Sequence, residues 1–386
     1  MIPLSAPNLN GKEVELLQKC IETGWLSTSG EFVNDFENKI ANFSKSKYAI
    51  ACNSGTAAIH IALKVLGVMP EDEVIVPTLT FIAPVNAVRY NLASPIFMDC
   101  DDFYNIDVEK TIEFIKSETE FKEGYSYNKK TGRRVFAIIP VHVWGNAVWL
   151  DELIKICRDR NILILEDASE SIGSRYTSGE FTNKHTGTIG EMGCLSFNAN
   201  KTMTTGGGGM ILTNNKLLAE KSMYLISQAK DDSINYIHNE IGYNYRLTNL
   251  HAAIGISQID RLQDFLKRKK EIHYFYSKNI DKLNGFSISK TPSYSINNHW
   301  LNILKIDRKI KNICKNSIIK TFQKNRIQVR PVWYLNHLQK PYLKYQNFKI
   351  ERAISLLEES ICLPSSSNLK EADQEKIIHI LEEFGS

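Results

Sequence analysis

From residue 48 to residue 213 the sequence alternates short apolar runs with segments whose apolar residues have helical spacing. The runs lie at 48–52, 73–77, 95–98, 135–140 and 162–165. The fourth run is apolar throughout, which is typical of a strand covered on both faces in a parallel sheet. This alternation predicts an α/β fold in which helices cover both faces of a mostly parallel sheet.

The length of 386 residues predicts two domains, because single cores rarely grow that large. We expect a large sheet-containing domain over residues 1–255. Beyond about residue 285 the strand and helix patterns become shorter, so we expect a smaller C-terminal domain over residues 256–386.

Composition excludes several classes of protein. A net charge of +4 is small for a nucleic-acid binder that relies on counterion release. No apolar run approaches the roughly 20 residues that span a bilayer, and the N-terminus lacks a signal-peptide pattern. The 7 cysteines are scattered, without disulfide or metal-ligand spacing. We therefore expect a cytoplasmic protein that binds neither nucleic acid, membrane nor metal.

Chemically useful side chains follow the predicted strands. Five of them fall at or near the carboxyl ends of strands: Thr56, Phe81, His142, Asp167 and Lys201. Ligands of open α/β sheets bind at that edge. The sequence therefore predicts a ligand site where these residues converge.

Lys201 stands between two apolar, strand-like runs, five residues after Ser196 and just before the glycines 206–209. A lysine in an apolar site can act as an amine nucleophile and form a Schiff base with a carbonyl. The alternative is a surface lysine on a turn between strands.

The segment 53–56, Asn-Ser-Gly-Thr, joins a predicted strand to a predicted helix. This arrangement directs the first backbone N–H groups of the helix at the turn, which makes an anion site. Ordinary helix capping explains the same residues equally well.

Together these positions match the needs of pyridoxal 5′-phosphate (PLP). Asp167 could pair with the protonated pyridine nitrogen, and Lys201 could bind the aldehyde and later move a proton. Thr56, the Ala57 backbone N–H and Ser196 could hold the phosphate. An aromatic residue, Phe81, could stack on the ring.

Each residue also has a simpler interpretation. Asp167 begins an Asp-Ala-Ser-Glu segment that reads as a helix capping box. Phe81 could be a core residue, and His142 a buried, hydrogen-bonded histidine. Only the combination of residues favours the cofactor.

Six segments, in order and spacing, resemble the DegT/DnrJ/EryC1/StrS sugar aminotransferases. They are 24–25, 53–57, 76–81, 166–168, 196–201 and 242–246. The resemblance covers nearly the whole chain. It implies the aspartate aminotransferase-like, fold-type I architecture, with a large αβα domain and a smaller α+β C-terminal domain. Lys201 favours an aminotransferase over the related dehydratases, which carry histidine there.

The resemblance further implies a homodimer with its active sites at the interface. In that arrangement Asn244 reaches the PLP phosphate of the neighbouring subunit, and Arg246 helps to bind the carboxylate of the donor, glutamate. Asn198 joins the residues around the cofactor. The alternative for 241–246 is a simple connector between helices.

Four further segments, 2–7, 184–188, 237–240 and 330–337, are similar to enzymes that aminate UDP-linked 4-keto-6-deoxy-N-acetylhexosamines for legionaminic acid or bacillosamine-type surface glycans. Amination at C3, a dehydratase and a non-catalytic regulator remain alternatives. Trp333 and His337 could instead be packing residues of the small domain. The residues assigned to substrate are Trp25, Ser27, His142, His185, Arg246, Trp333 and His337.

Glu170 departs from many relatives, which have Gln or His at this position beside the cofactor's phenolic oxygen. A carboxylate would repel a phenolate. Glu170 must therefore be protonated, directed toward the sugar or paired with a cation.

Overall fold

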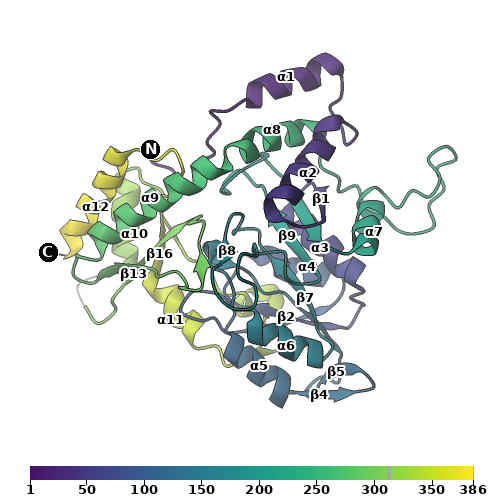
Figure 1. Ribbon diagram of the computed structural model, residues 1–386. Helices are drawn as coiled ribbons and strands as arrows, with labels where there is room; N and C mark the ends of the chain where they lie inside the picture. The colour runs from purple at the N-terminus through teal and green to yellow at the C-terminus, as the bar shows by residue number, and fades with distance from the viewer. Residues whose placement is uncertain (311–313, 386) are drawn as a thin grey trace.

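The computed structural model describes residues 1–310 and 314–385, and an eight-stranded sheet forms its centre (Figure 1). The strand order is β1-β10-β9-β7-β6-β2-β3-β15. Only β10 runs antiparallel to its neighbours, so the sheet is mostly parallel, as predicted. The strands are β1 (Tyr48–Cys52), β2 (Glu73–Pro77), β3 (Ser94–Met98), β6 (Val135–Ile138), β7 (Leu163–Asp167), β9 (Met192–Ser196), β10 (Gly209–Thr213) and β15 (Asn347–Phe348).

Helices cover both faces of this sheet. One face packs against α3 (Gly55–Leu66), α4 (Ile82–Tyr90) and α7 (Lys216–Ile226). The other packs against α2 (Glu31–Ser44), α5 (Val108–Ser117), α6 (Asp151–Asp159) and α8 (Asn249–Asp260). The three layers confirm the α/β fold expected from the alternating sequence.

The period of two along each strand explains why both faces are apolar. On β2, Val74 and Val76 face the layer of α3 and α4, whereas Ile75 faces the opposite layer. All three side chains are fully buried. A strand buried on both sides needs apolar residues at every position, which gives the continuous apolar runs.

The C-terminal part of the chain forms a second, antiparallel sheet, ordered β11-β13-β16-β14. Three helices pack against it and form a separate apolar core. Its strands are β11 (Phe286–Ile288), β13 (Asn302–Ile306), β14 (Arg330–Pro331) and β16 (Ser360–Leu363), and its helices are α9 (Leu262–Ile280), α10 (Lys315–Lys324) and α12 (Glu371–Gly385).

Each part of the chain sends one segment to the sheet of the other part. Ile2 pairs with Ile327 beside the second sheet, whereas β15 extends the large sheet. Both termini lie on the side of the second sheet (Figure 1). The expected domain boundary between residues 255 and 256 falls inside α8 and remains a proposal. The last residue of the expected C-terminal domain, 386, lies outside the described residues.

Smaller elements complete the fold. Residues 116–134 contain a hairpin of β4 and β5, and the helices α8 and α9 meet at Arg261. The remaining elements are α1 (Glu13–Thr23), β4 (Thr119–Lys122), β5 (Tyr125–Asn128), the 3-10 helix η1 (Val143–Gly145), β8 (Arg175–Tyr176), β12 (Ser295–Ile296), the 3-10 helices η2 (Asn336–Leu338) and η3 (Lys340–Tyr342), and α11 (Arg352–Glu359).

Every cysteine of the chain is a free thiol, and all except Cys314 are buried. Within residues 1–310 and 314–385, no helix combines the length and apolar character that crossing a bilayer requires.

Candidate active site

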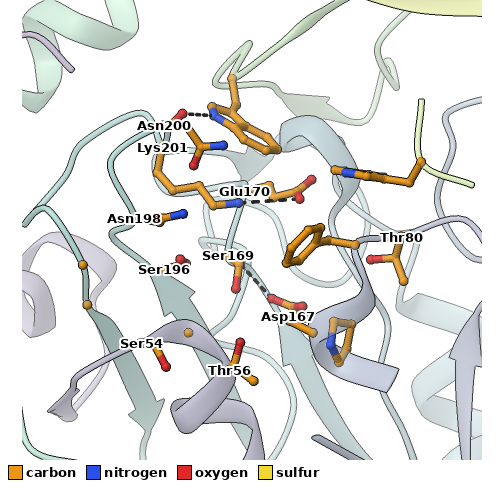
Figure 2. Close-up of a pocket in the computed structure, with 18 residues that line it drawn as sticks. Ser54, Thr56, Thr80, Asp167, Ser169, Glu170, Ser196, Asn198, Asn200 and Lys201 are labelled. Carbon is orange, nitrogen blue, oxygen red and sulfur yellow. Dashed lines mark hydrogen bonds and ion pairs between the residues drawn. The ribbon is translucent and has the colours of Figure 1, made fainter. Parts of the chain in front are cut away.

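A cavity of about 330 Å³ opens at the carboxyl edge of the large sheet. Figure 2 shows that its walls come from the loops after β1, β2, β7 and β9. Two tryptophans from the C-terminal part of the chain close it. The lining residues are Ser54, Gly55, Thr56, Thr80, Phe81, Ala83, Pro84, Asp167, Ser169, Glu170, Ser196, Asn198, Asn200, Lys201, Gly207, Gly208, Trp300 and Trp333.

Lys201 projects into this cavity from the loop that follows β9. Its Nζ lies 3.6 Å from Oε1 of Glu170 and 3.9 Å from the centre of the Trp300 ring. The loop is fixed because the Lys201 N–H donates to the carbonyl of Asn198 at 2.9 Å. Lys201 is therefore a cavity residue and not a surface lysine on a turn.

Glu170 is the anionic neighbour of this amine. Its Oε2 accepts a hydrogen bond of 2.9 Å from the backbone N–H of Trp144. Burial raises the pKa of Glu170 to about 7, although Lys201 and this N–H both act in the opposite direction. The structure thus pairs Glu170 with a cation, one of the three arrangements that its position requires.

Asp167 ends β7 and its side chain is 3% exposed. Oδ1 accepts from the Ser169 N–H at 3.0 Å, and burial raises the pKa of the carboxyl despite this bond and the charge of Lys201. Among the described residues, no basic side chain forms an ion pair with it. A buried carboxylate of this kind can hold a cationic N–H of a ligand.

The N-terminus of α3 forms another part of the cavity wall. Ser54 caps the helix by accepting a hydrogen bond of 3.1 Å from the Ala57 N–H. Ala57 is therefore occupied within the helix and does not line the cavity, whereas Gly55 and Thr56 do. A Cβ on Gly55 would lie 2.9 Å from Cβ of Ser196, so only glycine lets the two segments approach this closely.

Aromatic side chains form another part of the cavity wall. The Phe81 side chain is 52% exposed and lines the cavity, so it is not a core residue. Its ring centre lies 6.5 Å from that of Trp333, which stacks on Trp144 at 5.0 Å. A flat ring can pack between these groups and the floor of the cavity.

The donor set fits PLP. A helix N-terminus with nearby hydroxyls suits a phosphate, a buried carboxylate suits a pyridinium nitrogen, and a lysine amine suits an aldehyde. All three lie around one cavity, with Ser54, Thr56, Ser196, Asp167 and Lys201 directed toward it (Figure 2).

Several predicted residues lie elsewhere. Trp25 and Arg246 line a second cavity, of about 620 Å³, together with Phe32 and Asn249. Ser27 lies near it and accepts the Asn249 N–H at its backbone oxygen, 2.7 Å away. Asn244 is exposed and outside the Lys201 cavity. The single chain thus does not bring these four residues to Lys201.

The three predicted histidines also lie outside the cavity lining. His142 is fully buried, where Nε2 bonds to Glu166 at 2.9 Å and Nδ1 accepts the Val148 N–H at 3.0 Å. This is the hydrogen-bonded buried histidine of the simpler interpretation. His185 is half-buried, and burial lowers its pKa to about 4. His337 bonds to Oγ1 of Thr78 at 2.6 Å and thus braces the segment before Phe81.

Sequence reasoning missed some lining residues. Thr80 lies inside the recognised segment 76–81, and Ser169 directly follows the segment 166–168, so their positions were a usable signal. Trp300 follows β12, far along the chain from Lys201, and no local pattern marks it.

Comparison with known proteins gives the same result as the geometry. Residues 7–382 match the DegT/DnrJ/EryC1/StrS aminotransferase family. The chain is 36% identical to GDP-perosamine synthase from Escherichia coli O157:H7 over 383 residues, covering 99% of this chain and 97% of that one. It is 33% identical over 298 residues to UDP-4-amino-4,6-dideoxy-N-acetyl-beta-L-altrosamine transaminase from Campylobacter jejuni, covering 76% and 73%.

The fold agrees as well. A solved structure of a DegT DnrJ EryC1 StrS aminotransferase from Brucella abortus superposes with a TM-score of 0.87 at 26% identity, over 97% of this chain and 95% of that one. The cofactor is PLP. Because the family match covers residues 7–382 and the cavity has the matching residues, this chain belongs to the DegT/DnrJ/EryC1/StrS family of sugar aminotransferases.

Proposed function

We propose that this enzyme transfers an amino group from glutamate to the C4 carbon of a nucleotide-linked 4-keto-6-deoxy sugar. One observation carries the proposal: the Lys201 amine, the Asp167 carboxylate and the N-terminus of α3 surround one cavity. When bound there, PLP supplies an aldehyde that accepts an amino group and a protonated ring that withdraws electrons.

The residues of the chain divide the work of holding this group. The N–H groups at the start of α3, with the hydroxyls of Thr56 and Ser196, would bind the phosphate. The Asp167 carboxylate would accept a hydrogen bond from the ring nitrogen and keep it protonated. Phe81 would pack on the ring, and Asn198 also lines the cavity.

Lys201 moves the proton. Its Nζ projects into the cavity beside Glu170, and a positioned amine there would take the proton from the α-carbon of glutamate and return it at the carbon of the cofactor's aldehyde group. Trp300 and Trp333 limit the access of water from the side of the C-terminal sheet.

A second copy of the chain completes the site in this proposal. Asn244 and Trp25 are exposed, and Arg246 has a buried Nε with no hydrogen-bond partner among the described residues. In a homodimer, Asn244 would reach the phosphate bound by the other subunit. Arg246 would then bind the carboxylate of glutamate, since its guanidinium matches a carboxylate in two-point geometry.

For the sugar, we propose UDP-4-keto-6-deoxy-N-acetylglucosamine as the acceptor, converted to the 4-amino sugar for surface glycan synthesis. The similarity to a UDP-sugar transaminase supports this choice. The similarity to GDP-perosamine synthase, which spans nearly the whole chain, supports a GDP-linked 4-keto-6-deoxy sugar as the second candidate. The reaction takes place in the cytoplasm, where the free thiols stay reduced.

The test uses the PLP-bound enzyme with glutamate alone and then with each nucleotide-linked 4-keto sugar. Glutamate should bleach the visible band of the lysine-bound cofactor, and the correct sugar should restore it. Product masses should show an amine in place of the ketone oxygen, and NMR should place it at C4. A band that glutamate leaves unchanged would contradict the aminotransferase proposal, and amination at C3 would contradict the regiochemistry.

A further inference from the structure

Trp300 comes from the segment between β12 and β13 and reaches the Lys201 loop, which follows a strand of the other sheet. It is 3% exposed, and Nζ of Lys201 lies 3.9 Å from the centre of its ring. A cation over the face of tryptophan is attracted by the ring quadrupole, and the attraction grows when water is excluded. The ring therefore holds the end of the lysine side chain.

The same indole also holds the backbone behind the lysine. Nε1–H of Trp300 donates a hydrogen bond of 2.6 Å to the carbonyl of Asn200, the residue before Lys201 (Figure 2, dashed line at Asn200). The hydroxyl of Ser5 donates to the same carbonyl at 2.7 Å. Two donors from distant parts of the chain thus fix the peptide that carries Lys201.

Trp300 is itself held from both sides. The backbone N–H of Trp300 donates to Oδ1 of Asn298 at 2.9 Å, and its backbone carbonyl accepts from Nζ of Lys269 at 3.1 Å. Lys269 on α9 also donates to the carbonyl of Ser365 at 2.7 Å. Because its backbone is anchored to the second sheet and α9, the ring has little freedom to leave Lys201.

On the opposite side, Glu170 lies 3.6 Å from the same Nζ and is fixed by the Trp144 N–H. The lysine amine therefore sits between an aromatic face and a carboxylate. We propose that Trp300 is a positioning residue for Lys201: its ring, with Glu170 opposite, holds the lysine side chain at the place from which Nζ bonds to PLP once it has lost its proton, and its indole N–H fixes the adjoining backbone. This inference requires PLP at Lys201 but not the identity of the donor or the sugar.

The test measures how fast Lys201 bonds to added PLP. Full-length enzyme is stripped of cofactor with hydroxylamine and mixed with saturating PLP, and the growth of the visible band is followed. Trp300→Leu, which lacks both the ring and the donor, should form the band about tenfold more slowly. Trp300→Phe keeps a ring face but loses the hydrogen-bond donor. Its band should therefore form much faster than that of Trp300→Leu and almost as fast as that of wild type.

Matched variants separate positioning from folding. Ser5→Ala removes the other donor to Asn200 but leaves the ring, so its band should grow within about twofold of the wild-type rate. Thermal unfolding confirms that each variant is folded, and Trp300→Met replaces Trp300→Leu if the latter fails to fold. Trp300→Phe as slow as the non-aromatic variant, or a non-aromatic variant as fast as wild type, would overturn the proposal. Neither glutamate nor sugar is present in this measurement. The rate of band growth therefore tests the role of Trp300 even if the proposed amino transfer is wrong.

Discussion

His142 and Glu166 form a hydrogen bond of 2.9 Å between Nε2 and Oε2, and neither side chain is exposed to solvent. Glu166 also accepts the backbone N–H groups of Gly187, Ile189 and Gly190. Burial alone would raise the pKa of Glu166, but these donors outweigh it and lower the pKa. The pair therefore fixes the turn at 187–190 against the strand that ends on Asp167.

Replacing His142 with Phe should destabilise the protein without removing the cofactor. The change leaves a buried carboxylate short of one donor, which should lower the free energy of unfolding by about 3 kcal/mol. Urea unfolding measures this, and the visible band at Lys201 should remain. His379→Phe, at an exposed position, is the control. A normal unfolding curve with a raised KM for the sugar would instead show that His142 contacts substrate.

The contribution of Glu166 to the free energy of unfolding should also depend on pH. A carboxyl whose folded pKa is lowered stabilises the protein above its unfolded pKa, and this stability is lost as the pH falls through the folded value. The difference in unfolding free energy between wild type and His142→Phe should therefore shrink in acid.

The sequence predicted the layered fold because burial on both faces leaves a continuous apolar run, as on β2. It predicted Lys201, Asp167 and Thr56 because the carboxyl ends of parallel strands meet at one edge. Whether His142 points into the cavity or into the core depends on a partner 24 positions away, Glu166, and the strand pattern does not encode that choice. Trp300 lacked any local signal because only the packing of the C-terminal sheet brings it to Lys201.

Lys201→Ala should abolish the covalent attachment of PLP. The variant keeps Asp167 and the N-terminus of α3, so it should still bind PLP without the band of the lysine-bound form. Borohydride reduction followed by peptide mapping should label position 201 in wild type and nothing in the variant. Lys216→Ala, an exposed lysine on α7, is the control. Labelling of another lysine in wild-type enzyme would contradict the assignment.

Glu170→Gln should leave the enzyme coloured but change how the colour depends on pH. Burial raises the pKa of Glu170 to about 7, so its charge beside Lys201 changes near neutral pH. The visible band of wild type should show an inflection there, because a carboxylate favours a cation on the neighbouring nitrogen. Glutamine cannot ionise, so the inflection should disappear. A colourless variant would show that the carboxylate is needed to bind PLP.

Lys269→Met should remove a pH dependence of stability. Lys269 is 2% exposed, and burial lowers its pKa to about 7, below the value of about 10.4 in an unfolded chain. Between these values the unfolded chain binds a proton that the folded protein does not. Wild-type stability should therefore rise with pH relative to the variant, by up to about 1.4 kcal/mol per pH unit.

Urea unfolding measures this slope at several pH values between about 7.5 and 9.5. This range lies between the folded and the unfolded pKa of Lys269. The neighbouring, exposed Lys270 offers the control Lys270→Met, which should follow wild type. Equal slopes for wild type and Lys269→Met would show that the buried amine keeps its proton in the folded state.

Mixing two inactive variants tests whether Asn244 acts across a dimer. In a Lys201→Ala and Asn244→Ala heterodimer, one site carries both defects. The other is intact if each site takes Asn244 from the neighbouring subunit. Random exchange of subunits should then restore about a quarter of wild-type activity. If Asn244 serves its own chain, every site keeps a defect and mixing restores nothing. Light scattering of each parent protein verifies that both variants still form dimers, so that absence of rescue reports on the position of Asn244.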